Sequence, residues 1–367
     1  MWTFLFCVFI FCVFTILYTY FGYLFFLRIK ALLLLKPVFK KENLPFVSIV
    51  IAVYNGDKYI ERKLINILSQ NYPPNKFEVL VVSDGSIDNT NLIVEKMSLR
   101  YPNIKLIKYF PRRGKPYAIN KGVSAARGEI VVFADARQIF DVNALRELVY
   151  NFADKSIGCV SGELIFVENL DSKIRKEMGI YWNYEKKIRK LESQTGSVVG
   201  ATGAIYAIRK KLFEPIPENI LLDDVYIPLL IAEKKFRVVF DSAARAFDIV
   251  SPDFSKEKRR KIRTLLGNWQ LVFYKPSIIC PFGHPLWFRF VSHKFLRLLI
   301  PFFVSVSVLV SIFLGFPYYF YALFFIFCLF LTIVPGSAGS LFRSLFFLNY
   351  CALLSFVYLL KKKWDVW

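Results

Sequence analysis

The sequence predicts an α/β domain with a doubly wound, mostly parallel sheet, joined to helices that cross a membrane. Two properties of the whole chain suggest this combination. The formal net charge is +21 over 367 residues, yet the mean hydropathy is +0.42, which is high for a soluble protein. The third observation is that short β-rich runs alternate with helical segments in the first half of the central region.

Apolar runs without a charged residue predict the membrane helices. Residues 1–27 carry no charge, and the next uncharged block extends from Leu298 to Phe342. A crossing needs about 20 apolar residues, so the first run fits one helix and the second fits two, with a turn at residues 315–317. A last run, residues 344–360, is just long enough to cross. We therefore expect one helix over residues 1–27 and three helices over residues 300–360.

The segments beside these runs are basic. Residues 285–299 interleave aromatic side chains with Arg289, Lys294 and Arg297, a pattern typical of an amphipathic helix in the membrane interface. Lysines follow the first run and begin the basic tail, residues 361–367, and lysines beside a span favour its cytoplasmic side. Four spans cannot place both segments in the cytoplasm, so the side of the tail is open at this point. A cleaved signal peptide is disfavoured, because the first run lacks a basic start and a small-residue cleavage site.

The central region, residues 28–284, begins with short β-rich runs that helical segments separate. Apolar runs of this length between amphipathic helices are typical of a parallel sheet buried on both faces. Ligands of such a sheet bind at the carboxyl ends of its strands. The runs are FVSIVIAV, EVLVVS, IKLIKY and IVVFADA, and the helical segments are residues 58–70, 89–100 and 115–126.

Polar residues stand where three of these strands end. The first strand ends at Val53, Tyr54 and Asn55, the second runs into Asp84, and the fourth ends at Asp135. Because the carboxyl ends of parallel strands share one edge, we expect these residues to line one crevice. Each motif taken alone also fits a turn or a helix cap.

Several other classes of protein are disfavoured. The RRGK loop is not a P-loop, and no GxGxxG follows the first strand, so a nicotinamide or flavin enzyme is not expected. The chain has 2 His and 6 Cys without a CxxC pair, which argues against a zinc site or a disulfide framework. No zinc-finger, RRM or helix-turn-helix pattern accompanies the basic charge, so nucleic acid is not an expected partner. Because the chain has only 2 His, acid and base catalysis should rest on carboxylates.

Five motifs, taken in order, resemble the family 2 glycosyltransferases, which have the nucleotide-sugar-binding GT-A fold. The resemblance in order, spacing and strand-end placement extends from about Val47 to Val225. The flanking apolar helices bring it closer to the membrane-integral branch that includes the cellulose and hyaluronan synthases. The motifs are VSIVIAVYNGDKYIERKLINILSQNYP, EVLVVSDGSIDNT, RRGKPYAINKGVSAARGEIVVFADAR, VVGATGAIYAIRK and LLDDV.

The resemblance implies a site for a nucleotide sugar at the strand ends. Asp84 would accept hydrogen bonds from the base, residues 53–55 would support the base and ribose, and Lys115 would reach the nucleotide. Asp135 matches the first acid of the family's DxD motif. That acid holds the ribose and a divalent cation, Mg²⁺ or Mn²⁺, which bridges the diphosphate.

Arg137 replaces the second acid of that motif and cannot bind a metal. Arginine stays cationic and can hold phosphate oxygens with two hydrogen bonds, so Arg137 would supply part of the positive charge that a metal normally brings. Alternatively, Arg137 points away from the site and pairs with a surface acid. The need for a divalent cation is open at this point.

The last motifs imply the acceptor side of the site. LLDDV resembles the family's ED motif with Asp223 in place of the glutamate, which makes Asp224 the expected base for the acceptor hydroxyl and Asp223 an expected acceptor-binding residue. Two acids at a helix start also fit an N-cap and a dipole partner. Thr202 and Gly203 would form a wall of small residues beside the acceptor.

Membrane synthases of the family also carry a QxxRW motif near the membrane. The corresponding region here reads KRRKIRTLLGNWQLVF, with the glutamine and the tryptophan out of register. Arg260 and Arg263 can take the part of the arginine, and Trp269 would offer a stacking surface to a sugar of the acceptor. The departure leaves processive synthesis open.

The resemblance implies a membrane-bound, inverting glycosyltransferase that moves a sugar from a nucleotide diphosphate sugar, expected to be a UDP-sugar, to a hydroxyl acceptor in cell-surface polysaccharide synthesis. Two alternatives are transfer of a single sugar to a polyprenyl phosphate or lipid, and a non-catalytic membrane-bound nucleotide-binding protein. The expected partners are the donor, a glycan or lipid-linked acceptor, and membrane lipids. We expect a multi-pass protein of the plasma membrane with the central region in the cytoplasm, where nucleotide sugars are made.

Overall fold

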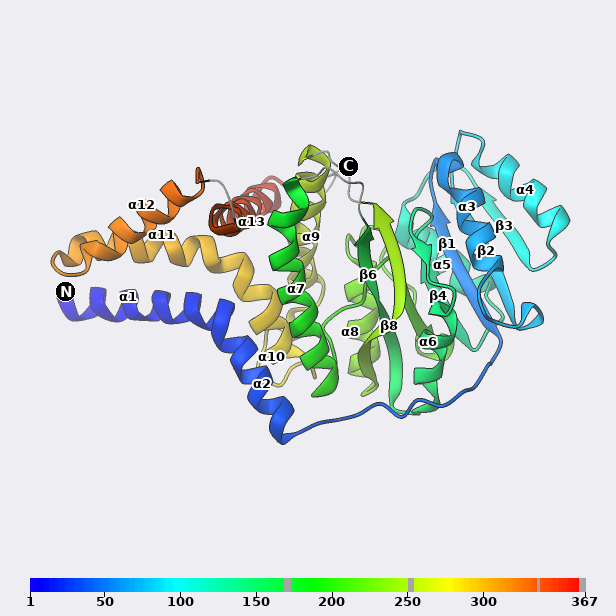
Figure 1. Cartoon of the computed structure of the whole chain (residues 1–367), viewed down its shortest axis with the longest axis horizontal. Helices are drawn as coiled ribbons and strands as arrows, with labels where there is room; N and C mark the ends of the chain where they lie inside the picture. Colours follow the sequence, from blue (N-terminus) through cyan, green and yellow to red (C-terminus); the bar gives the residue numbers. More distant parts are fainter. Residues whose placement is uncertain (168–172, 250–253, 335–336, 363–367) are drawn as a thin grey trace. The chain divides into compact units, whose positions relative to one another are not determined.

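The computed structural model describes residues 1–167, 173–249, 254–334 and 337–362 of the chain (Figure 1). The chain forms two compact units. The sheet unit consists of Leu35–Glu168 and Glu192–Val250, and the helical unit consists of Met1–Leu34, Asn169–Leu191 and Ser251–Trp367. Residues 28–34, 169–191 and 251–284, which the sequence assigns to the central domain, thus belong to the helical unit.

A mixed sheet forms the core of the sheet unit. Its strands follow the order β3-β2-β1-β4-β7-β6-β8-β5 in the described residues (Figure 1). The four strands expected from the sequence, β1 to β4, pair in parallel and form one half of the sheet. In the other half, β7 is antiparallel to β4 and β6, β8 is parallel to β6, and β5 is antiparallel to β8. The strands are β1 (Val47–Val53), β2 (Phe77–Asp84), β3 (Ile104–Tyr109), β4 (Ile130–Ala134), β5 (Ile139–Phe140), β6 (Ile157–Val167), β7 (Ile205–Arg209) and β8 (Arg237–Ile249).

Burial explains why these runs form parallel strands. Every residue of β2 and β4 is buried, and so is every residue of β1 except Ala52. Their β-branched side chains fit a pleated surface that is covered on both faces. The helices of the sheet unit are α3 (Asp57–Leu68), α4 (Thr90–Arg100), α5 (Lys115–Ala125), α6 (Ala144–Tyr150) and α8 (Asp223–Glu233).

A buried acid ties the amino ends of the strands together. The Glu78 side chain in β2 is fully buried, and its carboxylate accepts hydrogen bonds from the Ser48 hydroxyl at 2.8 Å and the Arg127 backbone amide at 2.8 Å. It also pairs with the side chains of Lys105 at 3.2 Å and Arg127 at 3.0 Å. Burial alone would raise the pKa of Glu78, but these donors outweigh it and the pKa is lowered.

Replacing Glu78 by glutamine is expected to lower the free energy of unfolding by about 2–3 kcal/mol at neutral pH, because the buried Ser48 hydroxyl, the Arg127 amide and the partly exposed Lys105 and Arg127 side chains lose an ionic hydrogen-bond acceptor. The folded-state pKa is depressed, so this contribution is present above the ordinary pKa of 4.5 and is lost as the pH falls through the folded-state value. Thermal unfolding of both proteins between pH 7 and 3 measures the difference. Glu95→Gln, which opens an exposed pair with Lys108, is the control and should change little. Equal stability of Glu78→Gln and the original protein at pH 7 would contradict the assignment.

Apolar helices make up most of the helical unit. α1 continues through a π-helical turn, Tyr18–Gly22, into α2, and α1 lies alongside α11 (Figure 1). The Phe9 ring of α1 contacts the Tyr321 ring of α12 edge to face, with centroids 5.1 Å apart. The helices are α1 (Trp2–Leu17), α2 (Tyr23–Leu33), most of α7 (Lys173–Gln194), α9 (Phe254–Tyr274), α10 (Trp287–Phe290), α11 (Leu296–Leu314), α12 (Tyr319–Leu331) and α13 (Ser337–Leu360).

Three stretches of continuous helix in the described residues are long and apolar enough to cross a membrane. They are Trp2–Leu33, Trp287–Leu314 and Phe342–Leu360. The expected turn after Leu314 is present, because α11 ends there and α12 begins at Tyr319. α12 is apolar but has 13 residues, or about 20 Å of helix against an apolar layer of about 30 Å. The fourth crossing therefore stays a prediction.

The interfacial helix expected over residues 285–299 does not form a separate element. α10, a π-helical turn and α11 make one continuous helix from Trp287 to Leu314. Its polar side chains are paired within the helical unit, since Glu185 of α7 contacts His293 Nε2 at 3.0 Å and Lys294 Nζ at 3.7 Å and also pairs with Arg297. The charges that suggested an interface are thus neutralised in part by a buried acid.

Candidate active site

Asp84 organises the loop between β3 and α5. Its carboxylate accepts hydrogen bonds from the Tyr109 hydroxyl at 2.9 Å, the Arg113 backbone amide at 2.7 Å and the Gly114 backbone amide at 2.9 Å. The side chain is 3% exposed, and burial together with Asp84 raises the pKa of Tyr109. Arg112 also approaches Asp84, with Nε 3.6 Å from Oδ2. The Asp84 carboxylate thus holds the loop of residues 112–114 in place. Its predicted hydrogen bonds with the base of a nucleotide stay a prediction.

The end of β1 is joined to the loop that follows β2. The Asn55 backbone amide donates to the Ser86 hydroxyl at 3.1 Å, and Asn55 Oδ1 accepts from the Ile87 amide at 3.0 Å. The Tyr54 ring is 41% exposed, and the Arg112 guanidinium lies 4.0 Å above it. Val53 is 5% exposed and belongs to the core, so only its backbone can face a ligand.

Lys115 stands at the centre of three carboxylates. Its Nζ lies 2.9 Å from Asp135 Oδ1 and 3.7 Å from Asp223 Oδ2. Burial would lower the pKa of Lys115, but Asp135, Asp223 and Asp224 together outweigh that effect and raise it. The first residue of α5 thus brings a permanent cation to the end of β4. The sequence placed Lys115 and Asp135 at the same edge, and the structure brings them into contact.

Asp224 is held by the loop that precedes β7. Its Oδ2 accepts a hydrogen bond from the Gly203 backbone amide at 3.1 Å, and its carbonyl oxygen accepts from Ala201 at 2.7 Å. Asp223 and Asp224 both lie in the first turn of α8, where the helix dipole favours negative charge. Thr202 is 9% exposed and its backbone amide donates to Ser161 of β6, so its side chain faces the interior.

Substituting Gly203 by alanine is expected to lower the turnover of any reaction that uses Asp224 about tenfold or more. A Cβ at this position would lie 3.0 Å from Asp224 Oδ2 and 3.5 Å from its Cγ, so the carboxylate must shift. Nucleoside diphosphate affinity should be unchanged, and its measurement beside turnover is the control. Unchanged turnover would mean that the present position of Asp224 is not required.

Tyr206 is a residue that sequence reasoning missed. Its side chain is fully buried in β7 and stacks on Phe133 of β4, with centroids 4.5 Å apart. Burial raises the pKa of Tyr206, and the charges of Asp223 and Asp224 raise it further. In the described part of the chain, neither its hydroxyl nor Asp223 Oδ2 has a hydrogen-bond partner. The apolar run AIYAIR predicts a buried strand, but nothing in it indicates that Tyr206 lies near the acids of α8.

Arg137 pairs with an acid that the sequence did not indicate. Its guanidinium lies 2.5 Å from Asp248 Oδ2 in β8, and Asp248 is 3% exposed. Gln138 donates to the same oxygen at 2.9 Å. The alternative in which Arg137 pairs with an acid therefore describes this structure, except that the acid is buried rather than on the surface.

The candidate site offers few protein ligands to a divalent cation. The described residues contain no group of three or more His, Cys, Asp or Glu side chains that could hold a metal ion. Asp135 is 36% exposed and offers one carboxylate, which Lys115 already contacts. A single carboxylate fits a cation such as Mg²⁺ that takes its other oxygen ligands from substrate phosphates and water.

Arg263 and Trp269 lie on α9 in the helical unit. Trp269 is 8% exposed, and its ring packs against Phe295 at 5.8 Å and Phe356 at 5.6 Å between centroids. These contacts make Trp269 a core residue of that unit, and little of its ring surface is open to a sugar. The acceptor roles of both residues remain predictions.

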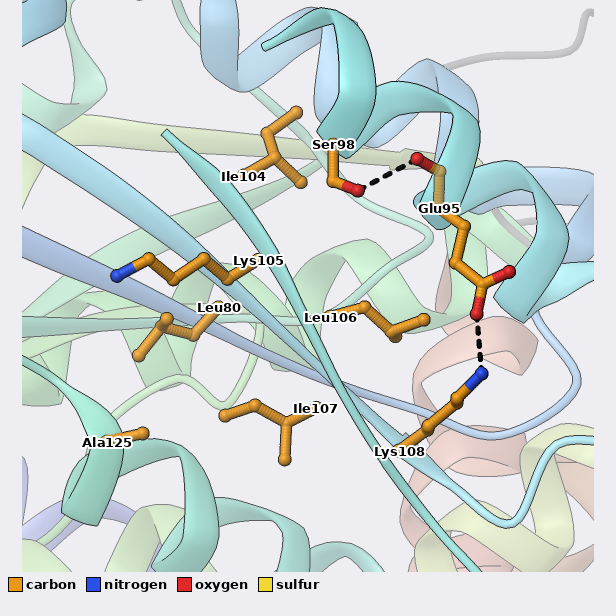
Figure 2. Close-up of a pocket in the computed structure, with 9 residues that line it drawn as sticks. All are labelled: Leu80, Glu95, Ser98, Ile104, Lys105, Leu106, Ile107, Lys108 and Ala125. Atoms are coloured by element: carbon orange, nitrogen blue, oxygen red, sulfur yellow. Dashed lines mark hydrogen bonds and ion pairs between the residues drawn. The ribbon is translucent and has the colours of Figure 1, made fainter. Parts of the chain in front are cut away.

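A groove of about 590 Å³ runs along the edge strand β3 (Figure 2). Its lining includes Leu80, Ile107 and Ala125, and none of the residues predicted for the site. Figure 2 shows Lys108 paired with Glu95, at 2.6 Å, and Lys105 also lines the groove and pairs with Glu78. Charged side chains of this kind protect an edge strand from pairing with another chain. The groove is therefore not part of the candidate active site.

The sheet unit has the GT-A fold of nucleotide-sugar-dependent glycosyltransferases. The solved structure of a mannosyltransferase, PcManGT from Pyrobaculum calidifontis in complex with GDP-Man and Mn²⁺, matches with a TM-score of 0.78 and 22% identity, over 98% of this chain and 99% of that one. A model of the family described as "Glycosyl transferase family 2" matches residues 48–216. Over residues 48–216 the chain is thus similar to glycosyl transferase family 2.

Two relatives are similar to this chain in sequence. Glycosyltransferase AglE from Haloferax volcanii is 40% identical over 94 residues, which are 26% of this chain and 31% of that protein. Poly-beta-1,6-N-acetyl-D-glucosamine synthase from Staphylococcus aureus is 24% identical over 242 residues, which are 65% of this chain and 58% of that protein. The chain thus spans less than two thirds of either relative.

Proposed function

We propose that this protein is a membrane-bound, inverting glycosyltransferase that moves a sugar from a nucleotide diphosphate sugar to a hydroxyl acceptor in cell-surface polysaccharide synthesis. The observation that carries the proposal is the cluster of Lys115 with Asp135, Asp223 and Asp224 at the strand ends of a family 2 domain. The relative in Staphylococcus aureus is named as a polysaccharide synthase, which supports the acceptor class.

The proposed reaction is a single displacement at the anomeric carbon. The acceptor oxygen forms a bond to that carbon, the bond to the diphosphate oxygen breaks, and Asp224 takes the acceptor's proton. Gly203 holds the receiving carboxylate in position. Lys115 stabilises the negative charge that develops on the leaving diphosphate, in a setting where the ammonium is already ordered by two carboxylates. A divalent cation held by Asp135, Mg²⁺ or Mn²⁺, would add positive charge at the same phosphates.

The nucleotide is assigned to the rim at the ends of β1 and β2. Tyr54 offers an exposed ring, Asn55 fixes the turn beside it, and Asp84 orders the loop that carries Arg112 and Lys115. The sequence favours a UDP-sugar, whereas the mannosyltransferase of similar fold was solved with GDP-Man. Both bases therefore belong in the test.

Transfer of one sugar to a polyprenyl phosphate or another lipid is the second candidate. It is favoured by the small number of long apolar helices, three in the described residues, because a threaded polymer needs a wider membrane channel. In either case we place the protein in the plasma membrane with the site in the cytoplasm. The glycan or lipid acceptor and the surrounding lipids are its proposed partners.

The test is nucleoside diphosphate release by the full chain in lipid nanodiscs. UDP-, GDP- and TDP-sugars are each supplied with magnesium, manganese or EDTA, and with an oligosaccharide or a polyprenyl phosphate as acceptor. We expect turnover with one donor, lower in EDTA, and greater with one class of acceptor than with the other. Absence of release with every donor and both acceptors would favour the non-catalytic nucleotide-binding alternative.

A further inference from the structure

The segment that follows Asp135 is fixed on one side by β8. Arg137 and Gln138 both reach Asp248 Oδ2, at 2.5 and 2.9 Å. The short strand β5 continues the attachment, because Ile139 and Phe140 pair with Phe247 and Ala246 of β8. Asp248 is buried, and a buried carboxylate is costly unless a cation and hydrogen-bond donors compensate it. Arg137 supplies that cation.

Helix α3 fixes the backbone of the same segment from another direction. Lys63 is fully buried and donates to the Gln138 carbonyl at 2.8 Å, with its ammonium 3.6 Å from the Phe140 ring centroid. Asn66 donates to the Phe140 carbonyl at 2.9 Å and accepts from the Phe140 amide at 2.8 Å. These contacts come from one face of α3, about one turn apart, and hold the backbone at Gln138 and Phe140.

The Arg137 side chain is therefore directed toward Asp248 of β8. Its guanidinium binds a strand residue 111 positions away in sequence, while the positive charge beside Asp135 comes from Lys115 at 2.9 Å. An arginine that compensates a buried acid loses that partner if it swings out to a phosphate, and the cost falls on Asp248. Arg137 therefore cannot pair with Asp248 and contact a phosphate at the same time, and in this structure it pairs with Asp248.

We propose that Arg137 is a positioning residue that pairs with buried Asp248 and thereby fixes the turn bearing Asp135, and that it does not contact the diphosphate of the donor. This inference rests on the proposed function of the site. Arg137 stands where the family's motif has a second metal-binding acid, and here it links this segment to β8 through Asp248. Lys115, with a cation on Asp135, then remains to neutralise the diphosphate.

A double-mutant cycle of Arg137→Ala and Asp248→Ala tests the proposal. The measurements are the turnover number, the donor KM and the affinity for the nucleoside diphosphate alone, all in nanodiscs well below each variant's unfolding temperature. We expect each single variant to lower turnover about tenfold, the double variant to be no worse than either, and nucleoside diphosphate affinity to stay within about threefold. Arg137→Lys should recover part of the turnover, because an ammonium still compensates the buried acid.

A different pattern would overturn the proposal. If Arg137→Ala weakens nucleoside diphosphate binding tenfold or more while Asp248→Ala leaves it unchanged, about 1.4 kcal/mol of binding comes from Arg137 itself. Losses in turnover that multiply in the double variant would also contradict the pairing. Lys108→Ala, which removes an exposed cation from an ion pair on β3, is the matched control and should change none of the three quantities.

One further measurement keeps the inference separate from the proposed function. Amide hydrogen exchange of residues 135–140 needs no turnover, and we expect it to be faster in Arg137→Ala and in Asp248→Asn, the milder variant, than in the original protein. Unchanged exchange in both variants would overturn the positioning role. If the original protein binds a nucleoside diphosphate but turns over no donor, the proposed function fails, and exchange together with affinity still decides the role of Arg137.

Discussion

Replacing Asp224 by asparagine is expected to lower the turnover number about 10²–10⁴-fold while nucleoside diphosphate affinity changes little. Asparagine has the same shape and still accepts the hydrogen bond from Gly203, but its amide cannot take a proton from an acceptor hydroxyl. Donor hydrolysis and transfer are compared in Asp224→Asn and the original protein, with the donor saturating.

Glu233→Gln is the matched control for this prediction. It removes one carboxylate from the opposite end of the same helix, α8, and turnover should not change. Turnover of Asp224→Asn within a factor of about three of the original would show that another group accepts the proton. Asp223→Asn separates the two acids of the motif, because Asp223 contacts Lys115 rather than Gly203, so its effect should fall on donor binding as well as on turnover.

Replacing Lys115 by methionine is expected to lower turnover about 10²–10³-fold and to weaken nucleoside diphosphate binding. The substitution keeps the length of the side chain but removes the ammonium 2.9 Å from Asp135 and 3.7 Å from Asp223. The remaining carboxylates then repel one another and the incoming diphosphate. Steady-state kinetics and nucleoside diphosphate titrations measure the two effects.

Lys121→Met is the control for the loss of a lysine from α5. Lys121 is exposed about 1.7 turns along the helix from Lys115. Its ammonium lies 5.5 Å from the Tyr117 ring centroid, and its loss should leave both quantities unchanged. If Lys115→Met lowered turnover but left nucleoside diphosphate affinity unchanged, the ammonium would act only on charge that develops during the reaction. Undiminished turnover would remove Lys115 from the site.

Much of the parallel half of the sheet could be predicted, because its determinants are local. β-branched runs buried on both faces specify β1 to β4, and polar residues after those strands specify one edge. The contact between Lys115 and Asp135 follows from that topology. The antiparallel pairings of β7 and β5 depend on contacts between distant segments, and no local pattern in the sequence predicts them.

The partner of Arg137 could not be predicted for the same reason. Asp248 lies 111 residues further along the chain, in a strand that sequence reasoning did not identify, so a surface acid was the available alternative. Trp269 shows a second limit of the sequence. Its aromatic ring near basic residues predicts sugar stacking, which stays a prediction, but the sequence does not show the contacts with Phe295 and Phe356 that bury most of the ring. Residue type indicates what a side chain can do, whereas burial decides whether it is available.

The anomeric configuration of the transferred sugar tests the central claim most directly. With the donor identified by the release assay, the product is isolated and its anomeric proton coupling is measured by NMR. A single displacement assisted by Asp224 predicts a product whose configuration is opposite to that of the donor. Retention of the donor's configuration would require two displacements and a covalent or ion-pair intermediate, and would contradict the assignment of Asp224 as the base for a direct attack by the acceptor.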